Sequence, residues 1–183
     1  MIPIIPPMKF RLVLNALLAV CVLPVAPWLR ADAEATPKRV LVVTVTTGFR
    51  HSSIPVAEAA LQRMAAGSGR FTVDFVRQPE GMPRPPGRPR PGPAGENDPA
   101  HQAALRKFAA DEKAFRATWD PRIEAALQAL SPANLRKYDA VLFASTTGDL
   151  PIPDKQGFID WIAGGKAFVG VHAATDTFHG FRP

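Results

Sequence analysis

Residues 39–53 read RVLVVTVTTGFRHSS, and this stretch decides the fold class. Its first part, 39–45, is a nearly continuous β-branched run, which is typical of a strand buried on both faces of a parallel sheet. The rest is a polar loop that precedes an amphipathic helix, and a second strand is predicted at 71–76. Strand, helix and strand within about 40 residues form a βαβ unit, which favours an α/β fold with a parallel sheet.

The helix of this unit has recognisable ends. Ser52 or Ser53 can cap it, Pro55 fits its first turn, and Gly67 is a plausible stop. The apolar stripe that we expect to face the sheet consists of Ala57, Ala60, Leu61, Met64 and Ala65.

The rest of the chain repeats the alternation of strand and helix. Helical composition predicts two helices, at 101–119 and 120–130, separated by Pro121. Strands are predicted at 138–144 and 167–171. A helix between these strands is expected to be capped by Asp154, to bury Phe158, Ile159 and Ile162, and to end at Gly164-Gly165.

Residues 78–100 interrupt this pattern. They are too rich in proline and glycine for a helix or strand, and we interpret them as a Pro/Gly/Arg-rich insert of polyproline-like backbone. The insert carries part of the chain's formal net charge of +6. A nucleic-acid-binding protein more often shows a long basic stripe interleaved with aromatic residues, so no nucleic-acid partner is expected.

The N-terminus has the pattern of an export signal, predicted at 1–33. Residues 8–11 (MKFR) form a positive region, 12–26 an apolar region, and Ala31-Asp32-Ala33 a cleavage site. The apolar run is shorter than the roughly 20 residues of a membrane-spanning helix. We therefore expect a periplasmic or secreted protein, without stable membrane insertion once the signal is removed. The only cysteine, Cys21, lies within this signal, which leaves no nucleophilic thiol in the mature domain at 37–183.

The chain stops at Pro183, soon after its fourth predicted strand. No further helix follows to complete the last βα unit. We therefore expect one face of the sheet to lack cover and the domain to be incomplete in this chain.

Polar residues gather in the three loops that follow predicted strands, 46–53, 145–150 and 172–180. Ligands of open parallel sheets bind at the carboxyl ends of the strands, so these loops form the candidate site. The sequence has no phosphate loop, no Gly-x-Ser-x-Gly nucleophile elbow and no Gly-x-Gly-x-x-Gly after the first strand. A nucleotide-binding enzyme of the common kinds is therefore not expected.

The segment Gly170-Val-His-Ala-Ala174 carries the main chemical hypothesis. It places His172 on a sharp turn after a buried strand, where related architectures hold a Ser or Cys nucleophile. His172 could act as general acid or base, serve as a metal ligand, or only hydrogen-bond neighbouring loops. Asp176 and His179 follow at helical spacing, and a His/Asp/His cluster would suit a divalent ion, although the spacing matches no standard zinc motif.

Two other loops offer substrate contacts. Arg50 and His51 could bind hydroxyl, carbonyl or carboxylate oxygens, or could bridge their loop to the next helix. Asp149 could accept hydrogen bonds from sugar hydroxyls or form a local turn.

Several ordered motifs resemble the ThuA-like trehalose-utilisation family. They are Gly48-Phe-Arg-His-Ser-Ser-Ile54, Tyr138-Asp-Ala-Val-Leu-Phe143, Thr146-Thr-Gly-Asp149 and Gly165-Lys-Ala-Phe-Val-Gly-Val-His-Ala-Ala-Thr-Asp-Thr177. The resemblance implies a flavodoxin-like sandwich of the class I glutamine amidotransferase-like fold, with helices on both faces of the parallel sheet. Amidotransferases have cysteine where His172 stands, so glutamine hydrolysis is not expected.

The resemblance also implies a role in sugar metabolism, with trehalose, related disaccharides or their keto derivatives as ligands. Among the residues of matching motifs, His172 and Asp176 are the predicted catalytic pair, with Asp176 orienting His172. The predicted substrate-binding residues are Arg50, His51, Thr147, Asp149 and Thr177. No cofactor is identified, and the predicted site contains no metal. A non-catalytic carbohydrate-binding domain and an inactive fragment are the alternative hypotheses.

Overall fold

The computed structural model describes residues 36–181, and the predicted signal at 1–33 lies outside the described residues. In chain order the helices and strands are β1 (Lys38–Val43), α1 (Ile54–Ser68), β2 (Phe71–Val76), α2 (Pro99–Leu127), η1 (Gln128–Leu130), α3 (Pro132–Leu135), β3 (Ala140–Ala144), α4 (Lys155–Ala163), β4 (Ala167–Val171) and η2 (His172–Asp176). The segments η1 and η2 are 3-10 helices.

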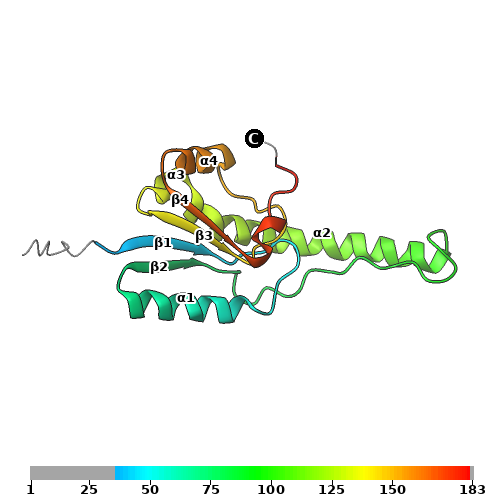
Figure 1. Ribbon diagram of the computed structural model, residues 1–183. Helices are drawn as coiled ribbons and strands as arrows, with labels where there is room; N and C mark the ends of the chain where they lie inside the picture. Colours follow the sequence, from blue (N-terminus) through cyan, green and yellow to red (C-terminus); the bar gives the residue numbers. More distant parts are fainter. Residues whose placement is uncertain (1–35, 182–183) are drawn as a thin grey trace, which may run out of the picture. The chain divides into compact units, whose positions relative to one another are not determined.

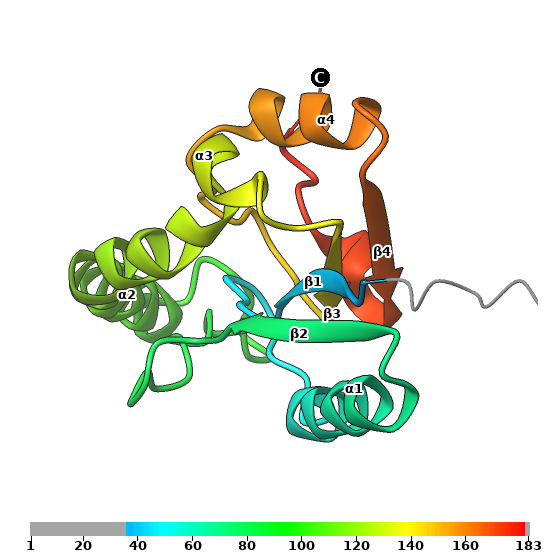
Figure 2. The same cartoon turned by 90° about the vertical axis from the view of Figure 1, so that its left-hand side faces the viewer.

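The described strands form one parallel sheet in the order β2-β1-β3-β4 (Figure 1). Helix α1 lies against one face of the sheet, whereas α2, α3 and α4 lie on the other side (Figure 2). This is an α/β fold with a flavodoxin-like arrangement, as the sequence predicted. None of the helices in the described part is long and apolar enough to cross a membrane.

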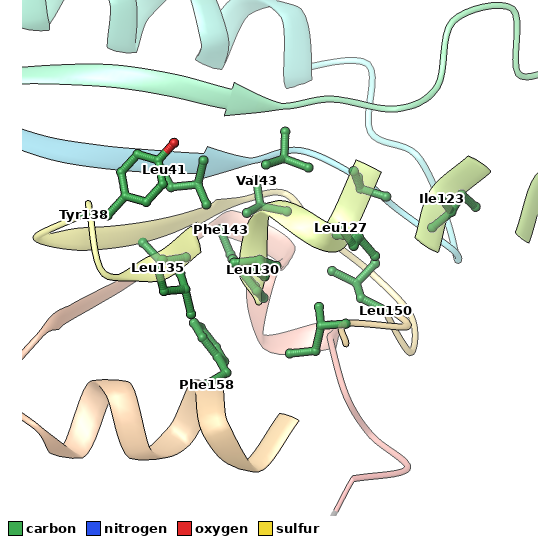
Figure 3. Close-up of a cluster of buried hydrophobic side chains, with 14 residues drawn as sticks. Leu41, Val43, Ile123, Leu127, Leu130, Leu135, Tyr138, Phe143, Leu150 and Phe158 are labelled. Carbon is green, nitrogen blue, oxygen red and sulfur yellow. The ribbon is translucent and has the colours of Figure 1, made fainter. Parts of the chain in front are cut away.

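The core is divided by the sheet because neighbouring residues of a strand point to opposite faces. Leu41, Val43, Val141 and Phe143 face α2 and α4 and join the larger hydrophobic cluster (Figure 3). Helix α2 contributes Ile123 and Leu127, and helix α4 contributes Phe158. A smaller cluster on the α1 side contains Val42, Leu142 and Ala144, with Leu61 of α1 packed against it.

Helix α2 is continuous, so the prediction of two helices separated at Pro121 is wrong. A proline inside a helix removes one N–H donor and crowds the carbonyl four residues earlier. The turn after Pro121 nevertheless stays helical because it places Ile123 and Leu127 in the core, where they are 2% and 0% exposed. Burial of these side chains outweighs the local cost of the proline.

The ends and the buried stripe of α1 also differ from expectation. Ser53 is the N-cap, but its side chain makes no capping hydrogen bond, and the helix passes through Gly67, ends at Ser68 and is capped by Gly69, with φ +62°. Met64 is 60% exposed. Successive helical residues are turned by about 100°, so Met64 points outward when Leu61 and Ala65 face the sheet. At α4 the predicted cap is confirmed, because Asp154 accepts a hydrogen bond from Gly157 N at 2.7 Å.

The pKa of Tyr138 leads us to expect that the free energy of unfolding falls at alkaline pH. Burial, aided by the hydrogen bond that its hydroxyl donates to Asp74, raises the pKa of Tyr138 to about 12 from 10.0. The neutral phenol therefore stabilises the fold fully below the unfolded pKa of 10.0, and this contribution is lost as pH rises toward 12.

Measured by urea unfolding, the free energy of unfolding is expected to be lower at a pH of roughly 11 than at roughly 9. The variant Tyr138→Phe is expected to reduce this difference. Tyr138 is the only tyrosine in the chain, so phenolate absorbance reports its ionisation directly. Ionisation of the folded protein at the ordinary pKa of tyrosine would contradict the prediction.

Candidate functional site

Two identical triplets meet where β1 and β3 end. Thr46-Thr-Gly48 follows β1 and Thr146-Thr-Gly148 follows β3, and the strands are paired with Val43 beside Phe143. The N–H groups of Thr47 and Gly48 donate to the carbonyl oxygen of Thr147 at 3.0 and 3.3 Å. The two loops therefore form one hydrogen-bonded platform at the carboxyl edge of the sheet.

Two of the predicted substrate-binding threonines hold this platform together. Thr147 is 1% exposed, and its hydroxyl donates to the carbonyl oxygen of Phe49 at 2.7 Å. The hydroxyls of Thr146 and Thr177 lie 2.8 Å apart, and a β-bridge joins Gly148 to Thr177. In this structure the hydroxyls of Thr147 and Thr177 thus connect loops of the protein to one another.

His172 lies on the sharp turn that the sequence predicted. Its backbone has φ +58°, a left-handed conformation that is uncommon and costly for residues other than glycine. Nδ1 lies 3.4 Å from the hydroxyl of Ser145, which itself has φ +56° at the end of the neighbouring strand. The His172 ring also meets the ring of His51 edge to face, with centroids 4.5 Å apart. His172 and His51 therefore lie side by side, although they are 121 positions apart in the sequence.

Asp176 contacts a different histidine from the one predicted. Its Oδ1 lies 2.8 Å from Nε2 of His179, and both side chains are largely exposed. Among the described residues, no hydrogen bond joins Asp176 to His172, and His172, Asp176 and His179 form no group that could hold a metal ion. The chain folds into the 3-10 helix η2 here, whereas the prediction assumed the spacing of an α-helix.

Arg50 contacts the end of β1. Its Nη1 donates to the carbonyl oxygen of Thr44 at 2.8 Å and approaches Oε1 of Gln78 at 3.3 Å. Burial lowers the pKa of Arg50, while the negative charge of Glu58 acts in the opposite direction. Arg50 therefore ties its loop to the end of β1 and to Gln78, and its hydrogen bonds do not reach the N-terminus of α1, which was the bridging role that the sequence left open.

Asp149 borders a cavity of about 600 Å³ at the carboxyl edge. One of its oxygens accepts a hydrogen bond from Gly180 N at 3.2 Å, and the side chain remains exposed. Thr47, Gly48, Gly148 and Pro151 line the same side of the cavity. The other lining residues come from the start of the proline-rich insert (Met82, Pro85 and Pro86) and from α2 (Glu112, Phe115, Arg116, Asp120, Ile123 and Glu124).

The α2 residues of this cavity were not predicted. They share one helix face, since Phe115, Arg116 and Asp120 follow Glu112 by three, four and eight residues. Arg116 forms ion pairs with Glu112 at 3.0 Å and Asp120 at 4.0 Å. A helix face that carries both charged and aromatic side chains is the sequence signal that could have identified these residues.

A second cavity, of about 640 Å³, adjoins the first and shares Gly48, Met82 and Pro85 with it. Arg50 and His51 line it on one side, and residues 78–85 line it on the other. The first part of the insert thus runs between two cavities that open at the ends of the strands. His172 contacts His51, which lines the second cavity, but is not itself among the lining residues of either cavity.

The comparisons with known proteins bear on the second half of the chain. The family model named ThuA, with the description trehalose utilisation, matches residues 92–182. This span includes the predicted motifs at 138–143, 146–149 and 165–177, whereas the motif at 48–54 lies outside it. Searches of curated proteins and of solved structures found no match. Through residues 92–182, this chain belongs to the ThuA family.

Proposed function

We propose that this protein is exported and acts on a sugar or keto-sugar at the carboxyl edge of its sheet, with His172 as general acid or base. The observation that carries the proposal is the strained turn at His172. It presents an imidazole in contact with Ser145 and with His51, which lines a cavity, in a chain of the trehalose-utilisation family.

The contact with Ser145 gives His172 a definite orientation. With Nδ1 directed at the Ser145 hydroxyl, Nε2 is the nitrogen left for a substrate. Ser145 is 2% exposed, so its hydroxyl can orient the imidazole ring but is not accessible to a ligand. A positioned imidazole can accept or donate a proton near neutral pH.

The lining of the 600 Å³ cavity suits a polyhydroxylated ligand. The carboxylates of Asp149, Glu112 and Asp120 can accept hydrogen bonds from hydroxyls, and Phe115 supplies an apolar ring on the same wall. Because Arg116 is already paired with Glu112 and Asp120, the cavity has little positive charge to offer a phosphate or carboxylate. These features favour a neutral sugar.

Export to the periplasm or the exterior rests on the sequence pattern at 1–33 alone. A soluble sugar outside the cytoplasm would then be the ligand that the mature domain meets.

A non-catalytic sugar-binding domain is the second candidate. It is favoured by the pairing of Asp176 with His179, which leaves His172 without a carboxylate partner among the described residues. The same cavities would then bind a sugar without converting it.

The variant His172→Ala separates these two functions. We expect it to lower turnover of the best substrate in a panel of disaccharides and keto-sugars by about 10²-fold or more, because general acid–base catalysis contributes on that order. Sugar affinity, measured by calorimetry, is expected to change less than about threefold, since the cavity walls remain.

His179→Ala is the matched control, because His179 lies in the same loop but contacts Asp176. It is expected to retain turnover and affinity. Wild-type protein that binds a sugar of the panel without converting it would favour the binding domain, and wild-type protein that binds no sugar of the panel would contradict both functions.

A further inference from the structure

The two cavities at the carboxyl edge differ in the charge of the residues that line them. The first cavity is rich in carboxylates, and its Arg116 forms ion pairs with two of them. The ionisable residues that line the second cavity are Arg50, His51 and Arg84, and none of its described lining residues is Asp or Glu. The second cavity is therefore suited to a ligand that carries negative charge.

The second cavity lies between two segments that follow neighbouring strands. Its lining residues come from 46–55, after β1, and from 78–85, after β2, and these strands are paired along their length (Figure 1). Strand β2 is the sheet edge opposite β4, so the cavity lies on the side of the sheet away from the last described strand. Its volume of about 640 Å³ is within the range typical of small-molecule sites.

The guanidinium of Arg50 is held in place from one side. Its Nη1 donates to the carbonyl oxygen of Thr44 at 2.8 Å and to Oε1 of Gln78 at 3.3 Å. The amide of Gln78 is itself fixed, because it accepts from Thr46 N at 2.9 Å and donates to Thr46 O at 3.1 Å. An arginine that is already ordered loses less conformational entropy when a ligand binds to it.

The other edge of this guanidinium has no partner in the described part of the chain. The hydrogen bonds of Arg50 to described residues use Nη1 alone, which leaves the N–H groups of Nε and Nη2 as donors. These two nitrogens present parallel N–H groups, the fork that binds both oxygens of a carboxylate or phosphate.

The charge of Arg50 is not neutralised by a carboxylate in contact with it. Burial lowers the pKa of Arg50, which means that the charged form is partly removed from water, and the charge of Glu58 acts in the opposite direction. Glu58 is engaged elsewhere, because its oxygens accept hydrogen bonds from Thr44 at 2.7 Å and from Arg77 at 2.6 Å. Glu80 is exposed and does not line the cavity. An anion beside Arg50 would offset the cost of its burial.

Arg84 brings a second positive charge to the cavity from the proline-rich insert. It takes part in none of the ion pairs within the described residues, and neither does Arg50. Pro83 and Pro85 flank it, and their fixed φ angles restrict the backbone that carries the charge.

We propose that the second cavity binds an oxyanion, the phosphate or carboxylate of a small polar ligand, on the Nε–Nη2 edge of Arg50, with Arg84 as a second positive charge. His51 lines the same cavity, and its ring can donate a hydrogen bond to the ligand. Binding of this kind requires no conversion of a sugar, so it does not depend on the function proposed above.

Calorimetry with glucose 6-phosphate, glucuronate and glucose tests the site and identifies the anion. The three ligands share a pyranose ring, so differences between them report the charged group. At least one of the two anions is expected to bind with an affinity that falls as the salt concentration rises from roughly 0.02 to 0.5 M, whereas the affinity for glucose should not depend on salt. Binding of glucose 6-phosphate alone would identify a phosphate site, and binding of glucuronate alone a carboxylate site.

Three variants locate the bound anion. Arg50→Lys keeps the positive charge but lacks the fork, and it is expected to weaken anion binding about tenfold, the effect of losing a hydrogen bond to a charged group. Arg84→Gln removes the second charge and is expected to weaken anion binding about threefold. Arg88→Gln is the matched control, because Arg88 also precedes a proline of the insert but lines neither cavity. It is expected to keep the wild-type affinity.

Failure of both anions to bind would overturn the proposal, and so would wild-type anion affinity in both Arg50→Lys and Arg84→Gln. Equal losses in Arg84→Gln and Arg88→Gln would also overturn it, because they would indicate an effect of charge outside the cavity. Urea unfolding checks that each variant is folded, and Arg84→Gln keeps the test decisive if Arg50→Lys is unstable. Anion binding by a protein that converts no sugar would support this site and contradict only the catalytic function proposed above.

Discussion

Replacing Phe143 with alanine is expected to lower the free energy of unfolding by about 3–5 kcal/mol, the usual cost of deleting a buried aromatic ring. Phe143 is 1% exposed and lies at the centre of an aromatic cluster. Its ring is stacked 5.9 Å from Phe158 of α4, meets Phe168 of β4 edge to face at 5.1 Å, and lies 6.1 Å from Phe178. A cavity at this position would remove contacts with α4, β4 and the loop after η2 together.

Urea unfolding of Phe143→Ala and of Phe49→Ala tests this expectation. Phe49 is 66% exposed, so the same truncation is expected to cost less than about 1 kcal/mol there. Similar losses in the two variants would show that the cluster around Phe143 does not stabilise the fold as its burial indicates.

The order of strands and helices followed from local patterns. The β-branched run at 39–45, the strands predicted at 71–76, 138–144 and 167–171 and their alternation with helices predicted the parallel sheet, and Asp154 marked the start of α4. These features depend on a few neighbouring residues, so they can be recognised without knowledge of the packing. The sharp turn at His172 was predictable for the same reason, because small residues follow an apolar strand there, although that strand is exposed in the structure and not buried as predicted.

The continuity of α2 could not be predicted in this way. Pro121 is a local signal for a break, whereas the burial of Ile123 and Leu127 depends on a sheet formed by distant segments. The wall that α2 contributes to the cavity depends on the same distant packing. Helical spacing showed which residues share a face, but not that this face would meet residues 82–86 and the ends of β1 and β3.

For the same reason, the position of the site residues could be predicted but their contacts could not. Sequence reasoning brought His51, Asp149 and His172 to one edge of the sheet, and the structure places them there. It could not show that Thr147 and Thr177 would use their hydroxyls within the protein, because those bonds join loops from different strands. Nor could residue spacing predict that Asp176 would contact His179.

Gly148→Ala is expected to have the largest effect among changes to the platform, with a loss of about 2–5 kcal/mol in the free energy of unfolding. Gly148 has φ +79°, which alone costs a residue with a Cβ about 1–2 kcal/mol. A Cβ at this position would lie 2.5 Å from Oγ1 of Thr47 and 2.7 Å from N of Gly48, closer than real contacts allow. The two triplet loops would have to separate.

Gly69→Ala is the matched control for this variant, because Gly69 has φ +62° but no heavy atom within 4 Å of the added Cβ. It carries the backbone cost without the steric one, so its loss in urea unfolding should stay near 1–2 kcal/mol. The difference between the two variants then measures the cost of separating the loops after β1 and β3. Equal losses would mean that the loops adjust freely, and Gly148→Ala should then keep its sugar affinity. A larger loss for Gly148→Ala together with weaker sugar binding would show that the ligand depends on the close approach of these two loops.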